Sequence, residues 1–135
     1  MREILFRGKR LDNGEWVEGD LRHGGYYLND PNVYIVVRFA DTVINYPVAP
    51  STVGQYTGLK DKNGRRIFEG DELAWHNGSG TVNFSNNGCF CVRLHGEIEY
   101  YGRNNPAIDI IFNLYPELEV IGNIHDNPEM YMEEA

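Results

Sequence analysis

Apolar and polar residues alternate over short runs along most of this chain, and turn-forming residues separate the runs. Thr81–Phe84, for example, has the two-residue period of a half-buried strand. Four Asn-Gly pairs indicate tight turns, because Asn tolerates a left-handed backbone and Gly adopts one without steric cost. These pairs are Asn13-Gly14, Asn63-Gly64, Asn77-Gly78 and Asn87-Gly88. No long apolar stripe has helical spacing, so the pattern predicts an all-β protein rich in hairpins.

The N-terminal part is predicted to be a β-hairpin or meander region of short strands. The expected strands are Ile4–Lys9, Glu15–Leu21, Tyr26–Leu28, Val33–Phe39 and Thr42–Val48. Val33–Val37 is apolar on both faces, so we expect it to be a central strand of its sheet. Pro47 and Pro50 mark the end of the region, because proline cannot donate to a strand ladder.

The stretch from residue 52 to residue 84 carries the clearest structural signal. Asn63 and Gly64 centre a hairpin turn between two short strands. A second break follows at Glu69, Gly70 and Asp71, where Gly70 can take a positive φ and Asp71 is expected to shape the corner. Short strands with such a corner and frequent tight turns are typical of a small closed barrel or a sandwich.

The last third of the chain is predicted to complete this barrel. Cys89–His95 is expected to be a strand, and Glu97–Tyr101 is expected to pair back onto it. Ala107–Leu114 fits either a strand or a short helix, whereas Glu117–Ile124 is a strand that could close the barrel. Asn127–Glu129 can start one helical turn, with Asn as its cap and Pro at its first position.

These elements predict three regions in one compact unit. The first is the meander over residues 1–50. The second is a barrel over residues 51–127, with an insertion around residues 102–116. The third is a C-terminal turn and tail over residues 128–135.

Three segments of the chain resemble a known family. They are VGQYTGLKDKNGRRIFEGDEL at residues 53–73, EVIGNIHDNPE at residues 119–129 and ILFRGKRLDNGEWVEGDL at residues 4–21. Together they resemble the YopX-like proteins of bacteriophages and prophages. The resemblance implies an all-β protein that contains an SH3-type barrel and is encoded by a phage or prophage. It carries over no catalytic or binding residues.

Length and composition indicate whether the chain can fold by itself and in which compartment it is expected. A chain of 135 residues buries enough surface on folding to be stable by itself. Nine Tyr and six Phe favour strands over helices. No long apolar segment predicts a transmembrane helix, and the first residues lack the apolar centre of a signal peptide. We therefore expect a soluble protein in the cytoplasm of a bacterial host, without a membrane partner.

The net charge of −8 is unevenly distributed. Residues 1–66 carry ten Lys and Arg against eight Asp and Glu, whereas residues 67–135 carry two against twelve. An acidic total makes nucleic acid an unlikely partner, because non-specific binding needs cations that displace counterions from phosphates. The simplest explanation of the acidity is that a negative net charge keeps the protein soluble.

No catalytic constellation is visible among the polar residues. His23, His76, His95 and His125 are scattered, without the spacing of a metal-ligand pair. Asp71 and Glu72 are neighbours that point to opposite faces of a strand, so they cannot form an acid/base pair by themselves. Cys89 and Cys91 share a strand face, are poorly placed for a disulfide, and are expected to be structural thiols. No metal or other cofactor is predicted. A catalytic triad assembled from distant segments is left open as an alternative.

One group of side chains could form an interaction surface, because small barrels often bind through exposed aromatic rings flanked by charge. Its candidate members are Tyr56, Arg65, Arg66, Trp75, Tyr100 and Tyr101, with Phe68 nearby. The alternative is that most of these rings fill the core of the barrel.

Three hypotheses of function follow. The leading one is a non-enzymatic accessory protein that acts through an unknown protein partner or as a homo-oligomer assembled mainly through its N-terminal half. The second is a nucleic-acid-associated protein, which binds through the Arg65 and Arg66 side or imitates nucleic acid with its acidic half. The third is an enzyme with a dispersed site, which a pocket joining a carboxylate and a His would favour.

Overall fold

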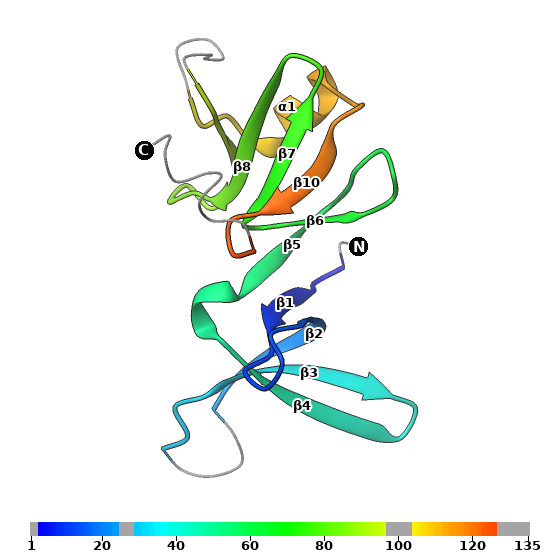
Figure 1. Cartoon of the computed structure of the whole chain (residues 1–135), viewed down its shortest axis with the longest axis vertical. Coiled ribbons are helices and arrows are strands. Elements are labelled where there is room, and N and C mark those ends of the chain that lie inside the picture. Colours follow the sequence, from blue (N-terminus) through cyan, green and yellow to red (C-terminus); the bar gives the residue numbers. More distant parts are fainter. Residues whose placement is uncertain (1–2, 25–28, 97–103, 127–135) are drawn as a thin grey trace. The chain divides into compact units, whose positions relative to one another are not determined.

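The computed structural model describes residues 3–24, 29–96 and 104–126 (Figure 1). The described residues form ten strands, one α-helix and one 3₁₀ turn. In chain order these are β1 (Phe6–Lys9), β2 (Trp16–His23), β3 (Val33–Phe39), β4 (Thr42–Val48), η1 (Pro50–Thr52), β5 (Gly54–Lys60), β6 (Arg66–Phe68), β7 (Asp71–Trp75), β8 (Gly78–Phe84), β9 (Phe90–Leu94), α1 (Ile108–Leu114) and β10 (Glu119–Asn123). The predicted all-β class is confirmed.

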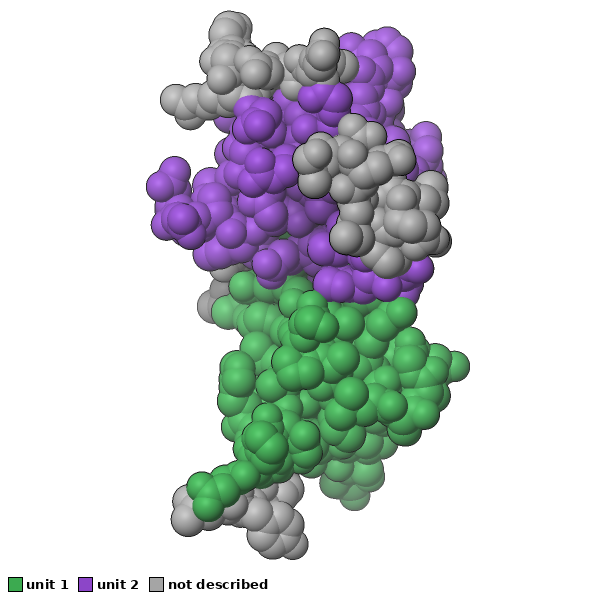
Figure 2. All heavy atoms as spheres, turned by 60° about the vertical axis from the view of Figure 1, so that its left-hand side comes forward, with its two compact units in different colours: residues 1–58 green, residues 59–135 purple. Residues whose placement is uncertain are grey.

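The chain divides into two compact units, which are coloured separately in Figure 2. Unit 1 is Met1–Gly58 and unit 2 is Leu59–Ala135. β5 carries the chain from one unit into the other, and β6 is its neighbour in unit 2. The boundary predicted from the prolines, at residue 50, lies eight residues earlier along the chain than the boundary between the two units.

Unit 1 is an antiparallel sheet with the order β4-β3-β2-β1-β5. β3 lies between β2 and β4, which agrees with the prediction that Val33–Val37 is central. The sheet curls, so that Arg10 forms a bridge with Val48 and the Ala49 N–H donates to the Lys9 carbonyl at 2.9 Å. Gly8 permits this approach, since a Cβ there would lie 3.0 Å from the Cβ of Val48.

The apolar core of unit 1 is small. Ile35, Val36 and Val48 are buried, whereas most other apolar side chains of β2 to β4 are half-buried or exposed. Rings paired with cations add to the packing: the Arg7 guanidinium lies 4.4 Å from the Trp16 ring centroid.

Unit 2 contains a second antiparallel sheet, with the order β10-β7-β8-β9, and α1 packs against it (Figure 1). Alternate residues of β7, β8 and β9 point into one apolar core with the helix. The buried members of this core are Ile67, Leu73, Val82, Phe90, Val92, Leu94, Ile108, Ile111, Leu118 and Val120. The segment that fitted either a strand or a helix is therefore helical from Ile108 to Leu114, because its Ile side chains at helical spacing reach this core.

The predicted barrel does not form from the described strands. β10 pairs with β7, but β9, at the other edge, does not pair with β10. Residues 104–107 occupy the outer edge of β9 instead: Val92 donates to the Pro106 carbonyl and Leu94 to the Asn104 carbonyl. Both sheets are thus open over the described residues, and the SH3-type assignment is not confirmed.

Most predicted turns have the expected backbone. Gly14, Gly64 and Gly88 have φ of 72°, 80° and 82°, and Gly70 has φ of 94° at its corner. The fourth Asn-Gly pair differs, because Gly78 already belongs to β8 and pairs with Trp75. The predicted strands at 26–28 and 97–101, the turn at 127–129 and the tail at 128–135 lie outside the described residues.

Candidate functional site

The sheet of unit 2 has a polar cluster on the face opposite its apolar core. Leu73 and Val82 point into the core, so their neighbours Glu72 and Thr81 point to the other face. Glu72 and Thr81 are register partners on β7 and β8, and His95 directly follows β9. Three strands therefore bring a carboxylate, a hydroxyl and an imidazole together.

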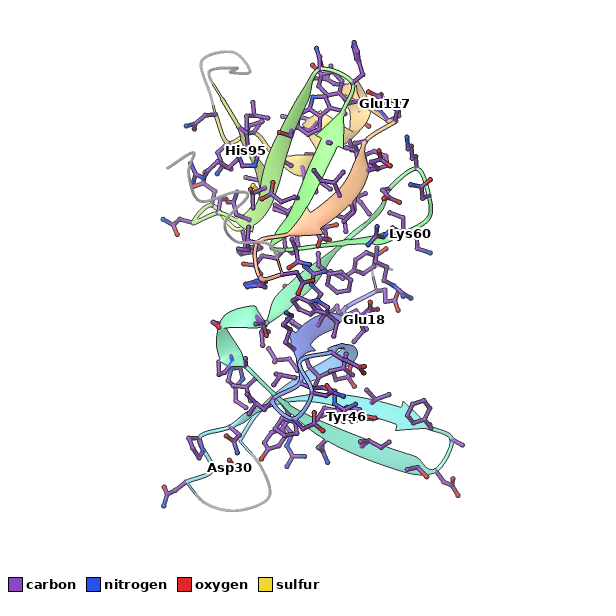
Figure 3. The ribbon with its side chains drawn as sticks, viewed as in Figure 1. Glu18, Asp30, Tyr46, Lys60, His95 and Glu117 are labelled. Carbon is purple, nitrogen blue, oxygen red and sulfur yellow. The ribbon has the colours of Figure 1, made fainter. Side chains whose placement is uncertain are left out.

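Short contacts join these three side chains. His95 Nε2 lies 2.7 Å from Glu72 Oε2 and 3.0 Å from Thr81 Oγ1, and Figure 3 labels His95 beside the sheet. The Thr81 hydroxyl donates to Glu72 Oε1. The Glu72 side chain is 0% exposed and that of His95 is 18% exposed. A buried carboxylate is costly without partners, and here both of its oxygens have one.

This arrangement does not have the geometry of a nucleophilic triad. In a triad, the carboxylate holds one ring nitrogen of the His and the nucleophile donates to the other. In this protein Glu72 and Thr81 both lie at Nε2 of His95, and the Thr81 proton goes to the carboxylate. The hydrogen bonds of these three side chains therefore link β7, β8 and the residue that follows β9.

This cluster is not predicted by the sequence pattern, which places Glu72 only beside Asp71. The two carboxylates do have separate partners, since Asp71 Oδ2 accepts the Phe68 N–H at 2.8 Å across the Gly70 corner. The His95 partner is 23 residues from Glu72 along the chain. No local pattern could have joined them, because the register of β8 and β9 brings them together.

The candidate aromatic residues do not form one exposed surface. Tyr56 and Phe68 are only 4% and 2% exposed, so their rings cannot present a binding face. Trp75 is half-buried and stacks on Tyr115, with ring centroids 5.3 Å apart. Tyr100 and Tyr101 lie outside the described residues. Packing thus accounts for the described rings of this group.

The arginines of the group belong to the hairpin between β5 and β6. Arg65 and Arg66 are exposed, and the Arg65 guanidinium donates to the Val120 carbonyl on β10 at 3.4 Å. Asn63 and Gly64 form the turn of this hairpin, as expected, and Gly64 has φ of 80°. Part of the positive charge therefore serves contacts within unit 2.

Asp61 fastens the same hairpin to β10. Its buried carboxylate accepts the N–H groups of Asn63, Arg65 and Val120, each at 2.9 Å. Burial by itself would raise the pKa of Asp61, but these backbone donors outweigh it, so the pKa is lowered. Because Val120 lies in an edge strand, the carboxylate also covers an edge donor of the unit 2 sheet.

β4, at an edge of the sheet in unit 1, is different. Its segment Thr42–Tyr46 contains no charged residue and no proline. Within the described part of the chain, no segment other than β3 hydrogen-bonds to the backbone of Thr42–Tyr46. At the end of the β3–β4 hairpin, Phe39 and Val43 are 56% and 51% exposed. This is an open, uncharged sheet edge.

The described residues contain no group of three or more His, Cys, Asp or Glu side chains that could hold a metal ion. Among the same residues, no helix is long and apolar enough to cross a membrane.

Comparison with known proteins gives a family and a fold. The family model described as YopX protein matches residues 5–131. Among solved structures, the crystal structure of protein EF1440 from Enterococcus faecalis is similar, with 22% sequence identity and a TM-score of 0.53. The match covers 96% of this chain and 99% of that chain, and at this identity it concerns the fold alone. Comparison with curated proteins finds no match.

Proposed function

Because this chain belongs to the YopX protein family, we propose that it is a phage- or prophage-encoded protein of the host cytoplasm that acts through protein contacts rather than catalysis. Specifically, unit 1 is a self-assembling module that pairs with a second copy along β4. The observation that carries this proposal is the open, uncharged edge of Thr42–Tyr46.

Exposed edges of this kind attract other strands, because their free N–H and C=O groups offer a ladder to any extended chain. Natural sheets commonly block them with charge, proline or a covering loop. The one proline of β4 is Pro47, where the chain already bonds elsewhere: the Pro47 carbonyl accepts the Leu11 N–H at 2.9 Å. The five residues before it are left to pair with another chain.

A second copy is a suitable partner for this edge. When two identical antiparallel strands are related by a two-fold axis, residue i of one copy pairs with residue j of the other and j pairs with i, which closes the assembly as a dimer. Electrostatic repulsion is small, since unit 1 carries six Lys and Arg against seven Asp and Glu. The apolar side chains Phe39 and Val43 would be covered in the same contact.

A charge placed on the edge tests this proposal. Val43→Lys should convert a dimer into a monomer, because lysine blocks edge pairing. Ile121→Lys is the matched control: Ile121 is also 51% exposed and also lies in an edge strand, but in unit 2. Light scattering coupled to gel filtration at micromolar concentration measures the mass of each variant, and circular dichroism checks that both are folded.

Three outcomes of this experiment count against the proposal. The first is a wild-type mass near the 15.5 kDa of one chain at both low and high salt. The second is a dimer that survives Val43→Lys. The third is a dimer that Ile121→Lys disrupts equally. The nucleic-acid alternative predicts an electrophoretic shift of DNA, or the loss of such a shift from a host DNA-binding protein, and Arg65→Ala with Arg66→Ala should remove direct binding.

A further inference from the structure

Two thiols meet at the base of the hairpin that joins β8 and β9. Cys89 Sγ lies 3.4 Å from Cys91 Sγ, and the Ser85 hydroxyl lies 3.5 Å from Cys89 Sγ. A backbone hydrogen bond closes the hairpin at this point, because the Ser85 N–H donates to the Cys89 carbonyl at 2.9 Å. Both cysteines are free, with Cys89 exposed and Cys91 buried.

We propose that Cys89 and Cys91 form a bidentate dithiol site for trivalent arsenicals that carry exchangeable hydroxyl groups. The exposed Cys89 makes the first bond, and the buried Cys91 closes the chelate. The site goes beyond the proposed contact function and uses no residue of β4.

The separation of the sulfurs favours a pyramidal trivalent centre over a tetrahedral metal ion. Two Zn–S bonds of about 2.3 Å at a tetrahedral angle would place the sulfurs roughly 3.8 Å apart. A pyramidal arsenic bonds its sulfurs at an angle closer to a right angle, which fits the shorter distance of 3.4 Å. A structural zinc site also needs four ligands, and the described residues contain no cluster of even three.

The protonation of the thiols supports the same ligand class. Burial raises the pKa of the Cys91 thiol, and its hydrogen bond with Cys89 raises it further. A bare metal cation would have to expel such protons into solution. An arsenical with two hydroxyl groups instead takes each thiol proton onto a hydroxyl, so that two As–O bonds break, two As–S bonds form and two waters leave. Arsenic stays trivalent, and no oxidant or reductant is needed.

Phenylarsine oxide is the probe for this site, since its hydrated form has two exchangeable hydroxyls and therefore reports a pair of thiols. We expect one probe per chain and the loss of both titratable thiols in the native protein. Cys89→Ser and Cys91→Ser should each weaken binding by about 100-fold or more, because the second bond of a chelate forms at high effective concentration. A small dithiol should reverse the binding, and an equal amount of a monothiol should not.

Ser85→Ala is the matched control, because it changes the neighbouring hydroxyl and leaves both sulfurs, and it should bind the probe normally. If Cys91→Ser does not fold, the exposed Cys89 still provides the test. Three results would overturn the proposal: no binding to the native protein, binding unchanged by Cys89→Ser, or release by the monothiol. Light scattering on the loaded protein separates this result from the proposed dimer, whose mass should not change.

Discussion

The two units of this protein treat their sheet edges differently. In unit 2 both outer strands are covered, β9 by the backbone of residues 104–107 and β10 by Asp61 and Arg65. In unit 1, β4 leaves Thr42–Tyr46 open within the described residues. A covered edge has its backbone groups bonded within the unit, whereas an open edge can hydrogen-bond to a strand of another chain.

The apolar cores of the two units differ as well, and the larger core belongs to the unit with the covered edges. Unit 2 buries ten apolar side chains in one cluster, whereas unit 1 buries Ile35, Val36, Val48 and Tyr56 and adds cations over aromatic rings. The charge follows this division, since unit 2 carries six Lys and Arg against thirteen Asp and Glu. The larger apolar core and the excess of acidic residues thus belong to unit 2, and the open sheet edge belongs to unit 1.

The largest expected effect concerns the two cores. Leu73→Ala should lower the free energy of unfolding by about 2–5 kcal/mol, because Leu73 is 0% exposed inside the cluster of unit 2. Val37→Ala in β3 should cost less than about 1 kcal/mol, since this side chain is half-buried and few of its contacts are lost. Urea denaturation of both variants measures the difference. Equal costs would remove the contrast between the cores.

A second prediction concerns two glycines with positive φ. Gly70 and Gly14 have φ of 94° and 72°, so valine should strain the backbone at both positions. Gly70 is buried at the corner before β7, whereas a Cβ on Gly14 would have nothing within 4 Å. Gly70→Val should therefore cost about 1–3 kcal/mol more than Gly14→Val through overpacking. Thermal denaturation compares the two, and equal midpoints would contradict a tightly packed corner in unit 2.

A smaller effect is expected from the carboxylate that covers β10. Asp61→Asn should cost about 1–2 kcal/mol near pH 7, because charged hydrogen bonds to three N–H groups are weakened. The pKa of Asp61 is lowered in the folded protein, so this stabilisation is present above its unfolded pKa of about 3.9. It should be lost as the pH falls through the lower, folded pKa.

Urea denaturation of the wild type and of Asp61→Asn between pH 7 and pH 2.5 checks this prediction. The difference between the two proteins should narrow at the acidic end. Asp12→Asn is a suitable control for the loss of a charge, because Asp12 is exposed and its carboxylate hydrogen-bonds Arg10 and backbone N–H groups of its own loop, so that it holds no strand edge. A difference that stays constant with pH would mean that the Asp61 charge does not hold β10.

Local sequence patterns predicted the class of the fold and many of its parts. The Asn-Gly turns, the Gly70 corner and strands such as β3 and β4 depend on backbone preferences of neighbouring residues, so a short window contains their cause. The YopX resemblance was likewise carried by contiguous segments, and the family match confirms it.

Tertiary structure decided the features that depend on distant residues. The predicted barrel did not close because residues 104–107, and not β10, lie beside β9, and the segment Ile108–Leu114 is helical because its apolar side packs on the core. The contact of Glu72 with His95 and the burial of Tyr56 arise from strand register and sheet packing. Such contacts join residues that no short window contains, and only the folded chain sets their register.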